Sequence, residues 1–245
     1  MPDNDNFLRL RINNRYRKLS FFYETAMVAF SNLHSTYCTG GETKMRLSLE
    51  VWRLVSTKDS AAYLILTADG YTLIDTGLFT AGRAITKELD RMHVTSLSKI
   101  LLTHHDQDHT GNMSLLQRKY NCPVYINSLD IPYIRGQKRR RSTKALFDFF
   151  IKTDNSATLS ALEDATFRDI TVIHTPGHTP GHSCFLFEGF LFAGDLFRLP
   201  KLRLKPYWLR TGWNTPTLEN TIREAIGLPF IWVCPAHFMP VKISP

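Results

Sequence analysis

The chain has 245 residues, of which 43% are hydrophobic, and it carries a formal net charge of +8. This length fits one large domain or two small ones, and the apolar content supports a buried core. No apolar run reaches the roughly 20 residues of a membrane-spanning helix, and no convincing secretory pattern is visible, so we expect neither a membrane protein nor an exported one. The charge alone selects no partner, because the basic residues gather in separate segments.

The cysteines lie far apart along the chain, at Cys38, Cys122, Cys184 and Cys234. The absence of pair spacing predicts reduced, mostly buried thiols in a cytoplasmic protein. Cys184 and Cys234 lie close to polar motifs described below. A supporting role at a site is therefore an alternative to plain core packing.

Residues 1–44 are expected to form an N-terminal extension that is poorly ordered or partly helical. A basic patch from Arg9 to Lys18 precedes an apolar and aromatic stretch, which favours a marginal helix over 19–32. The alternative is a docking or lid segment over a pocket. Met45 as the natural start is a further hypothesis, because the recognisable motifs begin after it. A peptide from residues 1–44 in the native protein would contradict that hypothesis.

Regular patterns begin after Met45. Apolar and polar residues alternate over 47–55, as in a half-buried strand. Strands over 61–67 and 71–75 flank Ala68-Asp69-Gly70, a sequence that predicts a hairpin turn. Helical spacing covers 81–92 and 111–120, and strands are predicted over 98–103 and 123–127.

The strand over 98–103 leads directly into a cluster of histidines and aspartates. Because alternate residues point the same way, His104, Asp106 and Asp108 can converge on one pocket. His109 would open the helix beside them. Imidazole and carboxylate groups are ligands for zinc, iron and manganese. The competing interpretation is a polar loop with solvated side chains.

The segment over 130–165 contains a strongly basic stretch. Residues 135–144 include six cationic side chains and no acidic one, and an aromatic helix around 146–150 follows. A solvated face is one interpretation, and a basic lid over an anionic substrate or a nucleic acid is the other. A second basic loop, 198–210, is interleaved with aromatic residues and is expected to rim a pocket.

The last third of the chain alternates strands with further polar motifs. Strands are predicted over 166–173, 183–187, 190–193 and 230–233, and a helix is predicted from Thr215-Pro216 to Gly227. The motifs that follow these strands contain His174, His178 and His182, then Gly194-Asp195, then Cys234-Pro235-Ala236-His237.

In this order, and after Ile74-Asp75-Thr76-Gly77, the motifs resemble the metallo-β-lactamase superfamily from about Met45 to His237. One position departs from the usual His-x-His-x-Asp-His pattern, because Asp106 replaces its second histidine. The resemblance implies an α/β fold, the αββα sandwich of two mixed sheets flanked by helices. That domain would span 45–245, with the basic insert at 130–165.

The resemblance also implies two divalent metal ions. His104, Asp106 and His178 would hold the first ion; Asp108, His109 and His237 would hold the second. Asp195 and a hydroxide would bridge them. Asp75 would orient the ligand loop, or would be a simple turn residue. No ligand role is implied for the other histidines: His182 would form hydrogen bonds near the loop, and His105, His174, His93 and His34 would be ordinary.

Asp106 in place of a histidine has a physical consequence. It lowers the formal charge of a two-metal centre by one, which makes the centre a weaker Lewis acid. The harder oxygen ligand also shifts preference from zinc towards manganese or iron. Zinc remains the first expectation, with manganese or iron as alternatives; a single occupied site is a further alternative.

The expected function is a hydrolase in which the bridging hydroxide cleaves an ester, lactone or thioester of a small, anionic or neutral molecule. Asp108 and Asp195 are the expected catalytic side chains. The family's glutathione thioesterases have a C-terminal region beyond His237 that is not seen here, and its homoserine lactonases have a tyrosine where Phe197 and Arg198 stand. The alternatives are a nuclease or phosphodiesterase, and a non-hydrolytic redox or binding protein. The oligomeric state is left open.

Overall fold

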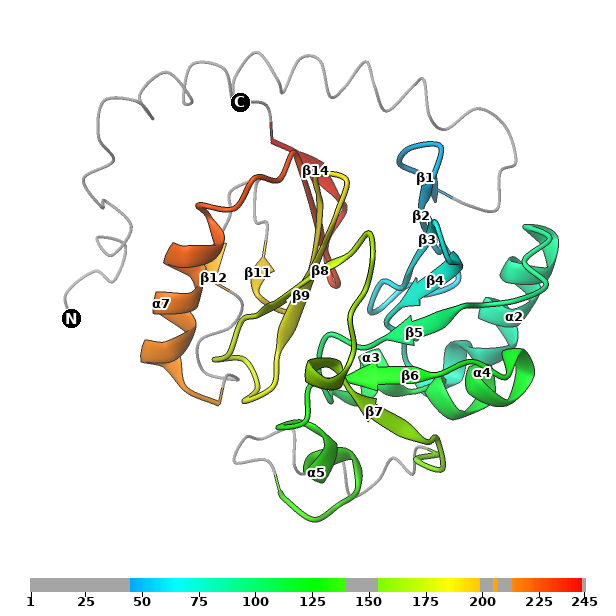
Figure 1. The fold of residues 1–245 in the computed structure, drawn as a ribbon, viewed down its shortest axis with the longest axis horizontal. Helices are drawn as coiled ribbons and strands as arrows, with labels where there is room; N and C mark the ends of the chain where they lie inside the picture. Colours follow the sequence, from blue (N-terminus) through cyan, green and yellow to red (C-terminus); the bar gives the residue numbers. More distant parts are fainter. Residues whose placement is uncertain (1–44, 140–153, 199–204, 207–212, 244–245) are drawn as a thin grey trace. The chain divides into compact units, whose positions relative to one another are not determined.

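The computed structural model describes residues 45–139, 154–198, 205–206 and 213–243. Several predictions lie outside these residues: the N-terminal extension with its helix over 19–32, the aromatic helix around 146–150, part of the basic stretch 135–144, and most of the second basic loop. Cys38 lies outside them as well. The described residues form two β-sheets with helices on their outer faces (Figure 1).

The first sheet has seven strands that follow each other in chain order. Its first four strands pair antiparallel, and from the fourth strand onward the pairing is parallel. The strands are β1 (Met45–Arg46), β2 (Val51–Arg53), β3 (Tyr63–Thr67), β4 (Gly70–Ile74), β5 (Lys99–Leu101), β6 (Val124–Ile126) and β7 (Leu159–Ala161).

The second sheet has five strands in the order β14-β13-β10-β9-β8. Only β10 and β13 are parallel within it. Its strands are β8 (Thr171–His174), β9 (Ser183–Phe187), β10 (Phe190–Gly194), β13 (Trp232–Pro235) and β14 (Val241–Lys242). A separate short ribbon pairs β11 (Phe197–Arg198) with β12 (Lys205–Pro206).

Helices cover the outer face of each sheet (Figure 1). Ile85 of α2 and Leu116 of α4 share one core cluster with Leu64 of the first sheet. Leu218 of α7 packs in another cluster with Leu191 of the second sheet. The helices are α2 (Gly82–Arg91), α3 (Gln107–Thr110), α4 (Met113–Tyr120), α5 (Ile131–Ile134) and α7 (Thr215–Ala225), with short 3-10 turns η2 (Phe79–Ala81) and η3 (Leu162–Asp164).

A third core cluster lies between the two sheets and explains the strand patterns. In β5, Ile100 packs under the helices while its neighbour Leu101 packs between the sheets. In β10, Phe192 packs between the sheets while Leu191 faces α7. Because successive side chains in a strand point to opposite faces, a strand that is apolar on both sides belongs to an inner layer. The predicted αββα sandwich is confirmed.

The element predictions are correct for most of the described chain. The hairpin is present: Thr67 pairs with Gly70 across a two-residue turn, and Gly70 has φ +108°, which favours glycine. Helices form near 81–92 and 111–120, and a third begins at Thr215-Pro216 as predicted. Cys122, Cys184 and Cys234 are buried and unbridged, as expected.

Two strand predictions were wrong in extent. Residues 47–55 do not form one strand, because the amides of Leu47 and Ser48 both donate to the carbonyl of Val51 and fold the chain back. The result is a tight hairpin in which Met45 pairs with Arg53. The strand predicted over 166–173 begins only at Thr171. The short elements β7, α5 and β14 were not predicted, since two to four residues carry little periodic signal.

Candidate metal centre

The seven predicted ligands all follow strand ends. His104 and Asp106 lie in the loop after β5, and the short helix α3 carries Asp108 and His109. The carbonyl of Asp106 accepts the amides of His109 and Thr110, which starts this helix immediately after the loop. The remaining predicted ligands follow β8, β10 and β13: His178, Asp195 and His237.

Four of these side chains form a first group, His104, Asp106, His178 and Asp195. Their ligand atoms lie within 4.8 Å of one another. Asp106 Oδ2 lies 3.6 Å from His104 Nε2 and 3.5 Å from His178 Nε2. All four residues are buried. Asp106, which departs from the family pattern, therefore faces the same point as the histidines around it.

The other three side chains, Asp108, His109 and His237, form a second group with ligand atoms within 4.8 Å of one another. Asp108 Oδ2 lies 3.2 Å from His237 Nε2 and 3.7 Å from His109 Nε2. The side chains of Asp108 and His237 are 28% and 22% exposed, whereas those of His104 and Asp106 are 0% and 4% exposed. The centre is therefore more open to solvent at the second group.

Asp195 lies between the two groups. Its Oδ2 is 3.2 Å from His178 Nε2 in the first group, and its Oδ1 is 3.2 Å from His237 Nε2 in the second. Gly194 allows this placement: its φ is +47°, and a Cβ there would come within 2.8 Å of His182 Nε2. One carboxylate oxygen thus faces each group.

The donor set fits two divalent cations. His104 Nε2 and both oxygens of Asp195 are buried, and none has a hydrogen-bond partner within the part of the chain that the structure describes. Buried polar atoms are normally paired, so several unsatisfied atoms at one point call for a missing partner. Imidazole nitrogens and carboxylate oxygens in such sets are ligands for zinc, iron or manganese.

Asp75 supports the second group from behind, as predicted. Its Oδ2 accepts a hydrogen bond from His109 Nδ1 at 2.8 Å, and its Oδ1 accepts the amide of Thr103 at 2.8 Å. The Thr103 hydroxyl donates to Asp75 Oδ2, also at 2.8 Å. A carboxylate on Nδ1 leaves Nε2 of His109 directed into the centre and fixes the ring.

The loop before β3 also touches the second group, and sequence reasoning missed it. The carbonyl of Asp59 accepts from His237 Nδ1 at 2.6 Å, and the buried Ser60 Oγ lies 3.2 Å from His109 Nε2. The buried carboxylate of Glu88 on α2 holds the loop by accepting the amides of residues 55 and 56. No local pattern marks Ser60, because its partner is far along the chain.

Charges within the centre shift the pKa values of its members. Burial lowers the pKa of His104, and His109 lowers it further. Burial also opposes protonation of His109 and His237, but nearby aspartates outweigh it, raising the pKa of His109 well above its usual value and that of His237 to about 10. Burial would raise the pKa of Asp195, yet the histidines hold it well below its usual range. Without metal, the second group therefore retains protons that a cation would displace.

His182 is not a member of either group, in agreement with the expectation. Burial, and then His178, lower its pKa to about 3, so its ring is neutral. Its Nε2 accepts the amide of Asp195 at 3.2 Å, and its Nδ1 lies 2.8 Å from the Thr175 hydroxyl. His182 thus fixes the backbone at the residue that lies between the groups.

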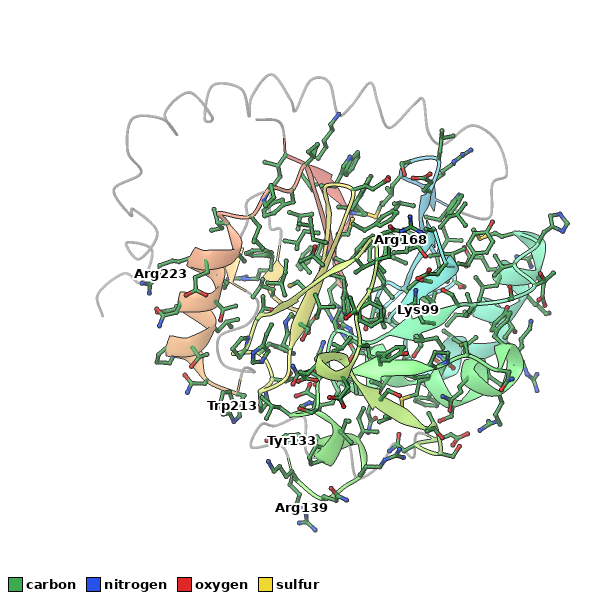
Figure 2. All side chains as sticks on the ribbon, in the orientation of Figure 1. Lys99, Tyr133, Arg139, Arg168, Trp213 and Arg223 are labelled. Atoms are coloured by element: carbon green, nitrogen blue, oxygen red, sulfur yellow. The ribbon has the colours of Figure 1, made fainter. Side chains whose placement is uncertain are left out.

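His105 and His174 also lie outside the two groups. His105 packs, as expected, with its ring stacked on Tyr133 of α5 at 4.4 Å between centroids, and its Nδ1 lies 2.8 Å from Asp130 Oδ2 (Figure 2 labels Tyr133). His174 Nε2 lies 2.9 Å from the carbonyl of Pro180. Asp130 is a further residue that sequence reasoning missed.

The described part of the basic segment includes Arg135, whose side chain is already used. Its guanidinium donates to the carbonyls of Asn155 and Ala157 at 2.7 Å and 2.8 Å. It therefore ties α5 to the chain that leads into β7. This contact does not support the basic-lid interpretation for Arg135.

A family model described as the metallo-beta-lactamase superfamily matches residues 56–237. The chain belongs to the metallo-beta-lactamase superfamily. The match runs from the loop beside the second group to His237, so it covers all seven predicted ligands. Among the described residues, no helix has both the length and the apolar character needed to span a membrane.

Similar proteins extend this result. A hydroxyacylglutathione hydrolase from Shewanella halifaxensis is 30% identical over 145 residues, which cover 59% of this chain and 46% of that protein. A protein from Bacillus velezensis named "Probable polyketide biosynthesis zinc-dependent hydrolase BaeB" is 35% identical over 118 residues, covering 45% of this chain and 44% of that protein. The chain thus spans about half the length of these curated relatives.

Among solved structures, this superfamily member is similar to TTHA1623, crystallised in a di-iron-bound form. The TM-score is 0.62 at 26% identity, and the alignment covers 76% of this chain and 91% of that one. The two chains share a fold over most of their described lengths.

Proposed function

We propose that this protein is a metal-dependent hydrolase that cleaves a small ester, lactone or thioester. The observation that carries the proposal is Asp195, a buried carboxylate with one oxygen facing each of two ligand groups. Two bound divalent ions would lower the pKa of a shared water towards neutrality and polarise the bond under attack. Such chemistry needs no serine or cysteine nucleophile.

The side chains take distinct roles in this proposal. The first group would hold one cation in its closed interior, and the second group would hold the other cation beside solvent. Asp108 is the catalytic carboxylate at this opening. Burial raises the pKa of Asp108, but His109 and His237 lower it by more, so the net pKa lies below its usual value and Asp108 starts ionised. It can accept a proton from the attacking water and return it to the leaving group.

The rim of the centre favours an acyl substrate with an apolar portion. Trp213 is 52% exposed, and its amide donates to the carbonyl of His178 at 2.9 Å (Figure 2). Met239 is 42% exposed and lies two residues after His237. A relative named for a hydroxyacylglutathione, which is a thioester, supports the same bond class. Anionic head groups stay compatible with this class.

The bound metal is a separate part of the proposal. One relative is named as zinc-dependent and one similar structure holds two irons, so both metals occur on related chains. We propose zinc as the first candidate, with manganese or iron favoured by the extra oxygen ligand of Asp106. Metal analysis after expression in a medium balanced in these metals tests the shift. Two zinc ions at full occupancy would count against it.

A substrate panel tests the activity. Metal-loaded protein is assayed with lactones, thioesters, esters and phosphodiesters, using His109→Ala and Asp195→Ala as blanks. We expect turnover of one carbonyl class and loss of that turnover in both blanks. Turnover of phosphodiesters alone, together with salt-dependent retention of RNA or DNA, would instead support a nuclease. Iron with oxygen uptake and no hydrolysis would support a redox protein.

A further inference from the structure

Asp130 lies behind the first group and forms an unusual number of contacts for a buried acid. It is the residue before α5, in the loop that follows β6, and it is 0% exposed. Its Oδ2 accepts the amide of His105 at 3.0 Å and the hydroxyl of Thr179 at 2.8 Å, and its Oδ1 accepts the amide of Gly181 at 2.7 Å. His105 Nδ1 lies a further 2.8 Å from Oδ2.

These contacts join two loops that are far apart in the sequence. His105 stands between His104 and Asp106, and Thr179 directly follows His178. The Asp130 carboxylate therefore contacts residues that are direct sequence neighbours of three members of the first group: His104, Asp106 and His178. A buried charge is costly unless several polar groups satisfy it, and here three hydrogen bonds and the nearby imidazole of His105 do so. The interaction holds only while the two loops keep their present spacing.

The second group is supported by other residues. His109 is backed by Asp75, and His237 is backed by the carbonyl of Asp59. None of the hydrogen bonds described for Asp130 reaches that group. Asp130 thus contacts only the chain beside the first group, whereas Asp75 contacts His109 of the second group directly and reaches His104 of the first group through the Thr103 hydroxyl, which lies 3.0 Å from His104 Nδ1.

We propose that Asp130 is a positioning residue that sets the spacing of the first group and controls its metal affinity separately from the second. The inference rests on the proposed two-metal centre and deepens it. Asp130 does not touch the ligand point itself. It acts through His105, Thr179 and Gly181, and stacking of His105 on Tyr133 keeps that imidazole in place.

The test is a pair of substitutions read by metal titration. Asp130→Asn keeps the shape but places an amide group among donors, so at least one contact is lost. Cobalt(II) is titrated into metal-free protein while its visible absorption is recorded, with His178→Ala and His237→Ala as references for each group disrupted alone. Asp169→Asn is the control, because Asp169 is an exposed carboxylate that accepts only the amide of Ala68 among its described hydrogen bonds.

We expect Asp130→Asn to lower the metal affinity of the first group by about 10–100-fold and to change that of the second group by less than about twofold. Its spectrum should match that of His178→Ala. Asp75→Asn should weaken metal binding most at the second group, through His109, and to a smaller extent at the first group, through Thr103 and His104. Wild-type affinity at both groups in Asp130→Asn, or equal loss at both, would overturn the proposal. Failure of the wild type to bind any metal would instead overturn the proposed function.

A second variant covers the case in which Asp130→Asn does not fold, as judged by circular dichroism of the metal-free protein. Thr179→Ala removes one donor from the carboxylate, and Thr179→Ser restores a hydroxyl there. We expect a smaller, selective loss at the first group in Thr179→Ala and recovery in Thr179→Ser. Equal behaviour of the two variants would contradict the positioning role.

Discussion

At the scale of single residues, neighbouring charges outweigh the effect of burial on the pKa values of His109, His237 and Asp195. His109 and His237 are drawn towards the protonated state by the aspartates around them, while Asp195 is drawn towards the ionised state. The protons of the metal-free centre and the expected metal ions therefore compete for the same nitrogen atoms. Metal binding and pH should be linked for this reason.

Metal affinity at the second group should rise with pH. Burial lowers the pKa of His237, but Asp195 and Asp108 raise it to about 10, so at about pH 7 a cation must displace its proton. Affinity should increase about tenfold per pH unit for each proton displaced, up to that pKa. Protonated His237 also stabilises the metal-free fold, because its pKa is higher in the folded than in the unfolded chain. That stabilisation is lost as pH rises from about 6.5 through about 10. Calorimetry in buffers of different ionisation enthalpy counts the protons, and no release at about pH 7 would contradict the prediction.

Ser60→Ala should strengthen metal binding at the second group selectively. The Ser60 hydroxyl lies 3.2 Å from the ring nitrogen of His109 that faces the centre, so its loss removes a polar contact at that nitrogen. Because this hydroxyl and a cation would compete for the same nitrogen, we expect a gain of metal affinity of up to about tenfold at the second group and no change at the first. Ser56→Ala is the matched control, because its hydroxyl has no hydrogen-bond partner in the described part of the chain. Equal titration curves for the two variants would argue against a role for Ser60.

At the scale of elements, α7 is joined to the loop that carries His178. The amides of Trp213 and Asn214, just before the helix, donate to the carbonyls of His178 and Gly177. The Asn214 side chain also caps the helix by accepting the amide of Thr217 at 3.0 Å. The start of one helix therefore supports both a packing layer and a ligand loop.

Asn214→Ala should cost about 1 kcal/mol of unfolding free energy through loss of the cap. The backbone bonds from residues 213 and 214 remain, so metal stoichiometry should not change. Chemical denaturation of the metal-free protein measures the cost. Asn220→Ala makes the same chemical change at an exposed position on the same helix and should be neutral or slightly stabilising. A loss of bound metal in Asn214→Ala would show that the cap matters more than its energy suggests.

At the scale of the whole described domain, the layer between the sheets carries large aromatic side chains. Phe185 and Phe192 are almost fully buried there, and Tyr63 contacts Phe192 with 5.2 Å between ring centroids. The Tyr63 hydroxyl donates to the carbonyl of Pro235 at 2.7 Å, two residues before His237. Packing between the sheets thus fixes how the ligand loops of one sheet meet those of the other.

Phe185→Ala should lower the unfolding free energy of the metal-free protein by about 3–5 kcal/mol, because a large side chain leaves a cavity in the inner layer. Leu49→Ala, at a position that is 75% exposed, should change it by less than about 0.5 kcal/mol. Adding metal at a hundred times its dissociation constant should add about 2.7 kcal/mol per occupied metal site to the unfolding free energy of each variant. Thermal unfolding with and without metal checks all three values, and an unchanged midpoint in Phe185→Ala would refute the packing account.

The sequence by itself was enough to predict which seven side chains come together, the sandwich and most of its long elements. Strand and helix periodicity, and the motif of residues 104–109, are local features, so a chain pattern shows them directly. The hairpin at 45–53 escaped prediction because alternation of apolar and polar residues looks the same in one strand and in two strands that fold back. The family resemblance implied how the seven side chains divide into two groups, and the tertiary structure decided their distances, their burial and the position of Asp195 between them. The tertiary structure also revealed Asp130 and Ser60, since their contacts join loops brought together by packing of the two sheets rather than by spacing along the chain.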